Sequence, residues 1–220
     1  CLILNSRPSR GDATIYLDRR PVAIASGDIL DFDGPGAQGQ ISGAPEFPAG
    51  RLPRFWLGLG DQTQPPADIL DEAPELFQAT DGWRGLTVLW CRFDVGPVDQ
   101  RRSYWPRVPP RVEVDADWSL VWDPRDAAQS ANDPTTWRWS ANQALCLLDA
   151  LRTNPVAAWP DASLDVESFA QAADVADEDV ALAAGGTEPR YEAHGTLVWT
   201  DTELLDQLDP LVLAGGGDFA

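Results

Sequence analysis

The chain is 220 residues long and contains no lysine, no methionine, one histidine and three cysteines. Without lysine it cannot form the Gly-x-x-x-x-Gly-Lys loop that cradles phosphate in many nucleotide-binding enzymes. One histidine, His194, is too few for a multi-histidine metal site, and an odd number of cysteines argues against a disulfide framework. No apolar run approaches the roughly 18–20 residues needed to cross a bilayer. We therefore expect no bound cofactor or metal and no stable membrane insertion.

Positive charge is also scarce, with 16 arginines against 35 acidic residues and a net charge of −19. Because nucleic-acid affinity comes mainly from Lys and Arg contacts to phosphate, specific nucleic-acid binding is not expected. The imbalance is uneven along the chain. Residues 1–112 hold 12 arginines and 14 acidic residues, whereas residues 113–220 hold 4 and 21. This shift predicts two modules, 1–112 and 113–220.

Catalytic motifs are missing as well. The sequence has no Gly-x-Ser-x-Gly elbow, and the Gly34-Pro35-Gly36 turn does not follow a clear strand-to-helix unit. We therefore expect a protein that is not an enzyme. Ten tryptophans beside many carboxylates leave one alternative open, a carbohydrate-binding module, because aromatic faces stack on sugars. The residues considered for such a site are Asp115, Asp117, Trp118, Trp122 and Asp123.

The first half of the chain is predicted to be rich in strands. Alternating or continuous apolar patterns favour strands at residues 12–17, 54–59 and 85–93. Glycine and proline make residues 28–50 turn and loop material between short strands, and a short helix is possible near 68–77. Residues 94–112, rich in proline and arginine, are expected to connect the two modules.

The second half is predicted to mix helices with strands. We expect a short strand at 118–122 and a helix that Ser140 caps and Asn154-Pro155 ends. A second helix is expected near 165–175 and a strand at 191–200. Thr202 is expected to cap a final helix that ends before a run of glycines. Together the two halves predict an α+β fold, with a β-rich N-terminal module followed by a mixed helix and strand module.

Several short motifs in the second half occur in an order that resembles a known family. Residues 121–125 read Val-Trp-Asp-Pro-Arg, and residues 137–151 read Trp-Arg-Trp-Ser-Ala-Asn before an amphipathic helix. Residues 169–178 read Phe-Ala-Gln-Ala-Ala-Asp-Val-Ala-Asp-Glu, and Arg190-Tyr191 precedes Gly195. This series resembles the J-type tail tip attachment proteins of long, flexible-tailed phages, also called host specificity or baseplate hub proteins. Gln143 stands where that family has proline, and Ala176 where it has cysteine.

The resemblance implies a structural component of the phage tail tip that closes the distal end of the tail tube and takes part in attachment and DNA delivery. It implies a homotrimeric ring that contacts the distal tail protein, the tape-measure protein and other tail-tip proteins. The protein would be assembled in the host cytoplasm and located in the virion, at the distal end of the tail. We also hypothesise that the acidic half lines the DNA passage, where like charge prevents sticking.

The site residues that the resemblance implies are structural. Asp123 and Arg125 are expected to hold a rigid corner around Pro124, and Ser140 and Asn142 to satisfy the start of the helix. The full set of family-motif residues is Asp123, Pro124, Arg125, Trp139, Ser140, Asn142, Phe169, Asp177, Glu178, Arg190 and Tyr191. Trp118, Trp122 and Trp137 are expected at contacts between subunits, and Trp139 is expected to be a packed anchor.

Overall fold

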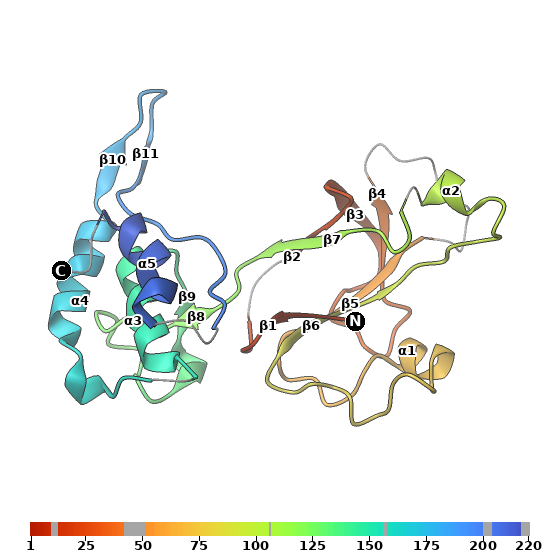
Figure 1. The fold of residues 1–220 in the computed structure, drawn as a ribbon, viewed down its shortest axis with the longest axis horizontal. Helices are drawn as coiled ribbons and strands as arrows, with labels where there is room; N and C mark the ends of the chain where they lie inside the picture. The colour runs from red at the N-terminus through yellow and green to blue at the C-terminus, as the bar shows by residue number, and fades with distance from the viewer. Residues whose placement is uncertain (10–12, 42–51, 106, 156–157, 200–203, 217–220) are drawn as a thin grey trace. The chain divides into compact units, whose positions relative to one another are not determined.

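The computed structural model describes residues 1–9, 13–41, 52–105, 107–155, 158–199 and 204–216 (Figure 1). The chain divides into two compact units, Cys1–Ser119 and Leu120–Ala220. Within the described residues, no helix has the length and apolar character that a membrane span requires. The fold is α+β with a β-rich N-terminal region, as the sequence predicts.

The first unit is a curled, antiparallel half-barrel of seven strands in the order β1-β6-β5-β4-β3-β2-β7 (Figure 1). Two short helices, α1 and α2, lie in its connections. The strands are β1 (Leu2–Asn5), β2 (Ala13–Leu17), β3 (Arg20–Ser26), β4 (Ala37–Ile41), β5 (Arg54–Gly58), β6 (Thr87–Arg92) and β7 (Val112–Ala116). The helices are α1 (Ala67–Glu72) and α2 (Arg101–Tyr104).

The neighbouring strands β5 and β6 are buried on both faces of the sheet. Phe55 and Leu89 belong to one apolar cluster, whereas Trp56 and Trp90 belong to another. Because side chains alternate between the faces of a strand, these consecutive apolar residues supply both clusters at once. The continuous apolar patterns near 54–59 and 85–93 therefore predicted these strands well.

The Pro- and Arg-rich segment 94–112 is part of the first unit, and its expected role as a connection between modules was wrong. Trp105 is 1% exposed, and its indole Nε1 donates to the carbonyl of Asp94. Its ring packs edge-on against Phe93, with ring centroids 5.3 Å apart. The segment then enters β7, which pairs along its length with β2. The boundary between the two units along the chain therefore falls between Ser119 and Leu120 and not after Val112.

The second unit packs helix α3 against α4 and α5. Its core cluster consists of Val121, Ala144, Leu145 and Ala173, and the alanines let α3 and α4 approach closely. The helices are α3 (Gln143–Thr153), α4 (Val166–Ala176) and α5 (Leu204–Ala214), with 3₁₀ turns at Pro134–Thr136 and Asp161–Ser163. The strands form two pairs, β8 (Leu120–Val121) with β9 (Arg138–Trp139), and β10 (Asp179–Ala181) with β11 (Thr187–Pro189).

Two sequence predictions in the second unit were wrong in detail. Helix α3 is capped by Asn142 and not by Ser140. The strand predicted at 191–200 is absent from its described part, 191–199, where one bridge joins Asn142 and Glu192. The extended pair lies earlier, in β10 and β11, because Gly185 and Gly186 provide a turn with positive φ. The expected cap at Thr202 lies outside the described residues.

Candidate functional site

The Asp-Pro-Arg sequence forms a tight corner just after β8. The Asp123 carboxylate accepts hydrogen bonds from the Arg125 backbone N–H (2.9 Å), from its Nε (2.9 Å) and from its Nη2 (2.8 Å). Both side chains are mostly buried, with 21% and 23% exposed. Pro124 fixes φ between them, which favours one turn geometry. The pairing of Asp123 with Arg125 expected from the sequence is thereby confirmed.

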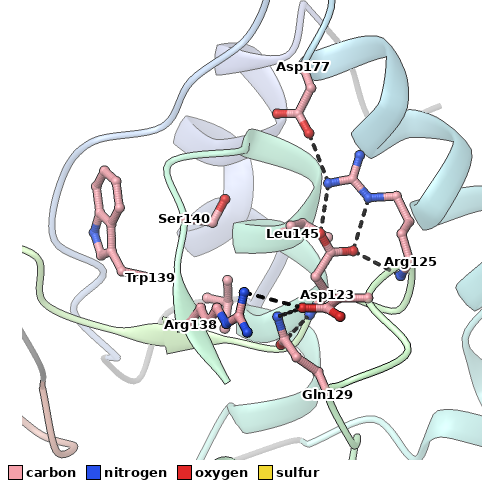
Figure 2. Close-up of a pocket in the computed structure, with 10 residues that line it drawn as sticks. Asp123, Arg125, Gln129, Arg138, Trp139, Ser140, Leu145 and Asp177 are labelled. Atoms are coloured by element: carbon pink, nitrogen blue, oxygen red, sulfur yellow. Dashed lines mark hydrogen bonds and ion pairs between the residues drawn. The ribbon is translucent and has the colours of Figure 1, made fainter. Parts of the chain in front are cut away.

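Arg125 also reaches the end of helix α4. Its Nη1 binds Asp174 at 2.9 Å. Its Nη2 binds Asp177 at 2.9 Å (Figure 2). One guanidinium thus holds three carboxylates, two of them about 50 residues away in sequence. Asp174 was not among the predicted site residues. Its only sequence signal was its position in the acidic end of a predicted helix, which does not identify a partner.

Asn142 joins the same group from the start of α3. Its Oδ1 accepts from the backbone N–H of Ala144 and of Leu145, at 3.1 and 3.2 Å. Its Nδ2 donates to the carbonyl of Ala173 (2.9 Å) and to Asp177 Oδ1 (2.8 Å). We call this set, Asp123, Arg125, Asn142, Asp174 and Asp177, the Arg125 network.

Ser140 supports the Arg125 network from outside it. Its hydroxyl oxygen accepts from the backbone N–H of Asn142 at 3.1 Å, and this bond fixes the turn before the helix. Asn142 itself is only 4% exposed. A buried amide with both of its polar atoms satisfied is a specific constraint on how the turn before α3 and the end of α4 pack.

Opposite charges set the protonation states within the Arg125 network. Partial burial raises the pKa of Asp123, but hydrogen bonds and charge from Arg125 outweigh it and hold that pKa below its ordinary value. Hydrogen bonding to Asp123, and to Asp174 and Asp177, raises the pKa of Arg125. Asp123 and Arg125 are therefore held in their charged forms at neutral pH. Neither is poised to donate or accept a proton, as a general acid or base would need to be.

A cavity of about 260 Å³ lies beside the Arg125 network. Asp126, Gln129, Arg138, Trp139 and Ser140 contribute to its wall, and Arg138 lies 3.7 Å from Asp126. Figure 2 shows the Trp139 side chain set apart from Asp123 and Arg125. Trp139 is 42% exposed, so the expectation that it is a packed anchor was wrong. Its strand is only two residues long, and both residues are exposed.

The last two motifs meet at the base of the β10–β11 pair. Arg190 binds Glu178 at 2.7 Å across the two strands. The backbone N–H of Tyr191 donates to the carbonyl of Ala176 at 3.1 Å, and the carbonyl of Tyr191 accepts from Gln143 at 3.4 Å. These bonds tie the pair to α3 and α4. Phe169 is half-buried on α4.

Two of the tryptophans expected at subunit contacts, Trp122 and Trp137, contact Arg152 within the chain. The guanidinium of Arg152 lies 4.7 Å from the ring centre of Trp122 and 5.6 Å from that of Trp137. Arg152 also binds Asp161 at 2.6 Å. Arg152 was not among the predicted site residues. Trp118 is half-buried and belongs to the first unit.

The residues considered for a sugar site belong to both units, and two of them have partners within the chain. Asp123 is engaged by Arg125, and Arg152 lies over the ring of Trp122. Asp115 and Asp117 belong to the first unit, whereas Asp123 belongs to the second.

Among the described residues, no group of three His, Cys, Asp or Glu side chains is arranged to hold a metal ion. Comparison with protein-family models, curated proteins and solved structures returned no match.

Proposed function

We propose that the protein is a structural component of a bacteriophage tail tip, a hub that closes the distal end of the tail tube and takes part in attachment and DNA delivery. One observation carries the proposal. The motif residues that resemble the tail tip attachment family bind one another and hold one another in place. Residues 123–125, 140–142 and 174–178 form one network of charges and hydrogen bonds, and Arg190 and Tyr191 fix the adjoining strand pair.

The chemistry of the Arg125 network supports a structural role. Three carboxylates share one guanidinium, and the amide of Asn142 bonds with both its oxygen and its nitrogen. Such a saturated group specifies one packing arrangement and leaves little capacity to activate a substrate. A part that must dock against the distal tail protein, the tape-measure protein and copies of itself needs this kind of fixed geometry.

The proposal can be tested by immunogold labelling of the phage particles produced from the genome that encodes the chain. We expect gold at the distal end of the tails and co-purification of the chain with the distal tail and tape-measure proteins. Arg125→Ala should reduce the number of tailed particles, whereas Arg138→Ala, which removes an exposed ion pair outside the Arg125 network, should not. Particles that carry full tails but never contain the chain would refute the proposal.

One observation favours a second candidate, the carbohydrate-binding module. Trp139 presents an exposed indole beside a small cavity that also contains Asp126, Gln129 and Arg138. Glycan-array binding by the purified chain, lost in Trp139→Ala and kept in Trp159→Ala, would favour this candidate. Trp159 is a matched control because it is 43% exposed, close to the value for Trp139.

A further inference from the structure

The β10–β11 pair is a hairpin whose strands pair only with each other. It projects beyond the helices of the second unit (Figure 1). Asp179 pairs with Pro189 and Ala181 with Thr187, and all residues from 181 to 190 are exposed. Leu182, at the turn, is 40% exposed. A two-stranded hairpin in water is at best marginally stable, so an exposed one that is held at its base gains from a partner strand.

Only one edge of this hairpin suits further pairing. β11 contains Glu188 and Pro189, and proline has no N–H to give to a neighbouring strand. β10 reads Asp179-Val180-Ala181 and continues into Leu182, without proline. Charged side chains and prolines are the usual means by which proteins block strand edges. β10 carries one charge, Asp179, at its base and has no proline, so it is the more open edge of the hairpin.

The half-barrel of the first unit has two edge strands, β1 and β7. β7 carries Glu113 and Asp115, which would repel the acidic base of the hairpin. β1 reads Leu-Ile-Leu-Asn and carries no charge. Leu2 is 38% exposed and Ile3 is 59% exposed. Of the two edges, β1 alone offers an apolar, unprotected strand of a length that matches β10.

We propose that β10 of one copy pairs with β1 of a second copy of this chain, so that the hairpin extends the neighbour's half-barrel. Such strand addition supplies main-chain hydrogen bonds and lets Val180 and Leu182 cover apolar surface near Leu2 and Ile3. Because donor and acceptor edges differ, the contact is head-to-tail and closes a ring if the rotation permits. This inference rests on the self-association contained in the proposed function, and it names the surfaces involved.

Charge favours a contact between unlike units. Residues 113–220 hold 21 acidic residues against 4 arginines, so two acidic units would repel each other. Residues 1–112 are nearly balanced, with 12 arginines against 14 acidic residues. Placing the hairpin of one copy on the half-barrel of the next brings an acidic surface to a nearly neutral one. This argument selects a second copy's first unit as the partner surface.

Cysteine cross-linking tests the pairing directly, because Cys1 precedes β1 and is exposed. Val180→Cys and Ala181→Cys are made separately, since side chains alternate along the strand and one of the two should face the partner. With a short bismaleimide, we expect a ladder of covalent dimers and higher species from at least one variant. Adding Cys1→Ser should abolish the ladder.

Matched controls separate a specific contact from random collision. Val98→Cys introduces an equally accessible thiol in the first unit, at a position that is 80% exposed, and should give no ladder. Ile3→Asp places a charge on β1 and should reduce the ladder at least tenfold while circular dichroism stays unchanged. An intramolecular product, no product, or a ladder that survives Cys1→Ser would overturn the pairing. Immunogold labelling is scored separately, so a hub without this contact is distinguishable from a chain that is not in the tail.

Discussion

Arg125 is the side chain on which the packing of the second unit depends most. Its substitution by alanine leaves Asp123, 21% exposed, without its charge partner and removes the link to α4. Breaking hydrogen bonds to a largely buried charge costs about 2–3 kcal/mol, and the pair with the 72%-exposed Asp174 adds little. We expect Arg125→Ala to lower the free energy of unfolding by that amount in urea titrations.

Arg138→Ala provides the matched control for this measurement. Arg138 is 72% exposed and lies 3.7 Å from Asp126, and such surface pairs contribute about 0–1 kcal/mol. We expect an unfolding midpoint close to that of the natural sequence. If the two arginine variants lose equal stability, the Arg125 network is not a determinant of the fold.

Stability should also fall in acid for a reason located at Asp123. Arg125 holds the pKa of Asp123 below its ordinary value despite partial burial. A carboxyl group with a depressed folded-state pKa stabilises the fold above its unfolded pKa of about 4, and that contribution disappears as pH falls through the lower, folded-state pKa. We expect urea titrations to show this loss below roughly pH 4. In Arg125→Ala the loss should be smaller, and an identical pH profile would contradict the assignment.

Sequence reasoning found the local half of the Arg125 network and missed the distant half. Asp123 and Arg125 are two residues apart across a proline, so their pairing follows from local geometry. The contacts to Asp174 and Asp177 depend on how α4 packs against α3, which no local pattern encodes. Trp139 was misjudged for a related reason, since its burial depends on what covers a two-residue strand.

At the scale of elements, Gln143 supplies a hydrogen-bond donor to the end of α5. The last four carbonyls of an α-helix have no N–H partner within the helix. Gln143, at the first position of α3 and 8% exposed, donates its Nε2 to the carbonyl of Leu211. The proline that the resembling family has at position 143 has no such donor. The glutamine therefore couples the start of α3 to the last turns of α5.

Removing this coupling should loosen α5 specifically. Gln143→Ala loses one hydrogen bond of about 1 kcal/mol and leaves the Leu211 carbonyl without this donor. We expect amide hydrogen exchange to quicken about fivefold across Leu204–Ala214 and to change little in α4, since about 1 kcal/mol corresponds to that factor. Gln171→Ala, which removes an exposed bond to Glu167, should leave the exchange of α5 unchanged. Uniform quickening in both helices would point to global destabilisation instead.

Elements were predictable where one strong pattern determined them. Strands β5 and β6 follow from continuous apolar runs, and α3 and α4 from apolar residues at helical spacing. β3 was missed because, from Ala23 onward, its residues are exposed on both faces and show no alternation. The predicted strand at 191–200 failed because its apolar residues pair with no neighbouring strand among the described residues.

At the scale of the whole molecule, the change in charge lies close to the structural boundary but does not define it. Composition placed the division after residue 112, where arginines become scarce. The structure divides after Ser119, because β7 completes the half-barrel before the chain leaves it. Glu113 and Asp115 thus belong to the first unit despite their acidic surroundings in sequence. Charge along the sequence describes the surface of a segment. Strand pairing determines to which unit the segment belongs.

Two truncated chains test this boundary. A chain ending at Ser119 keeps β7, whose Val112 and Val114 pack against the cluster containing Ile15 and Leu17. A chain ending at Val112 loses that pairing and exposes part of the cluster, at a cost of about 2–4 kcal/mol. We expect the longer chain to unfold cooperatively on heating, followed by tryptophan fluorescence, and the shorter one to melt at a clearly lower temperature. Equal melting temperatures would mean that the half-barrel is complete without β7 and that the boundary belongs where the charge changes.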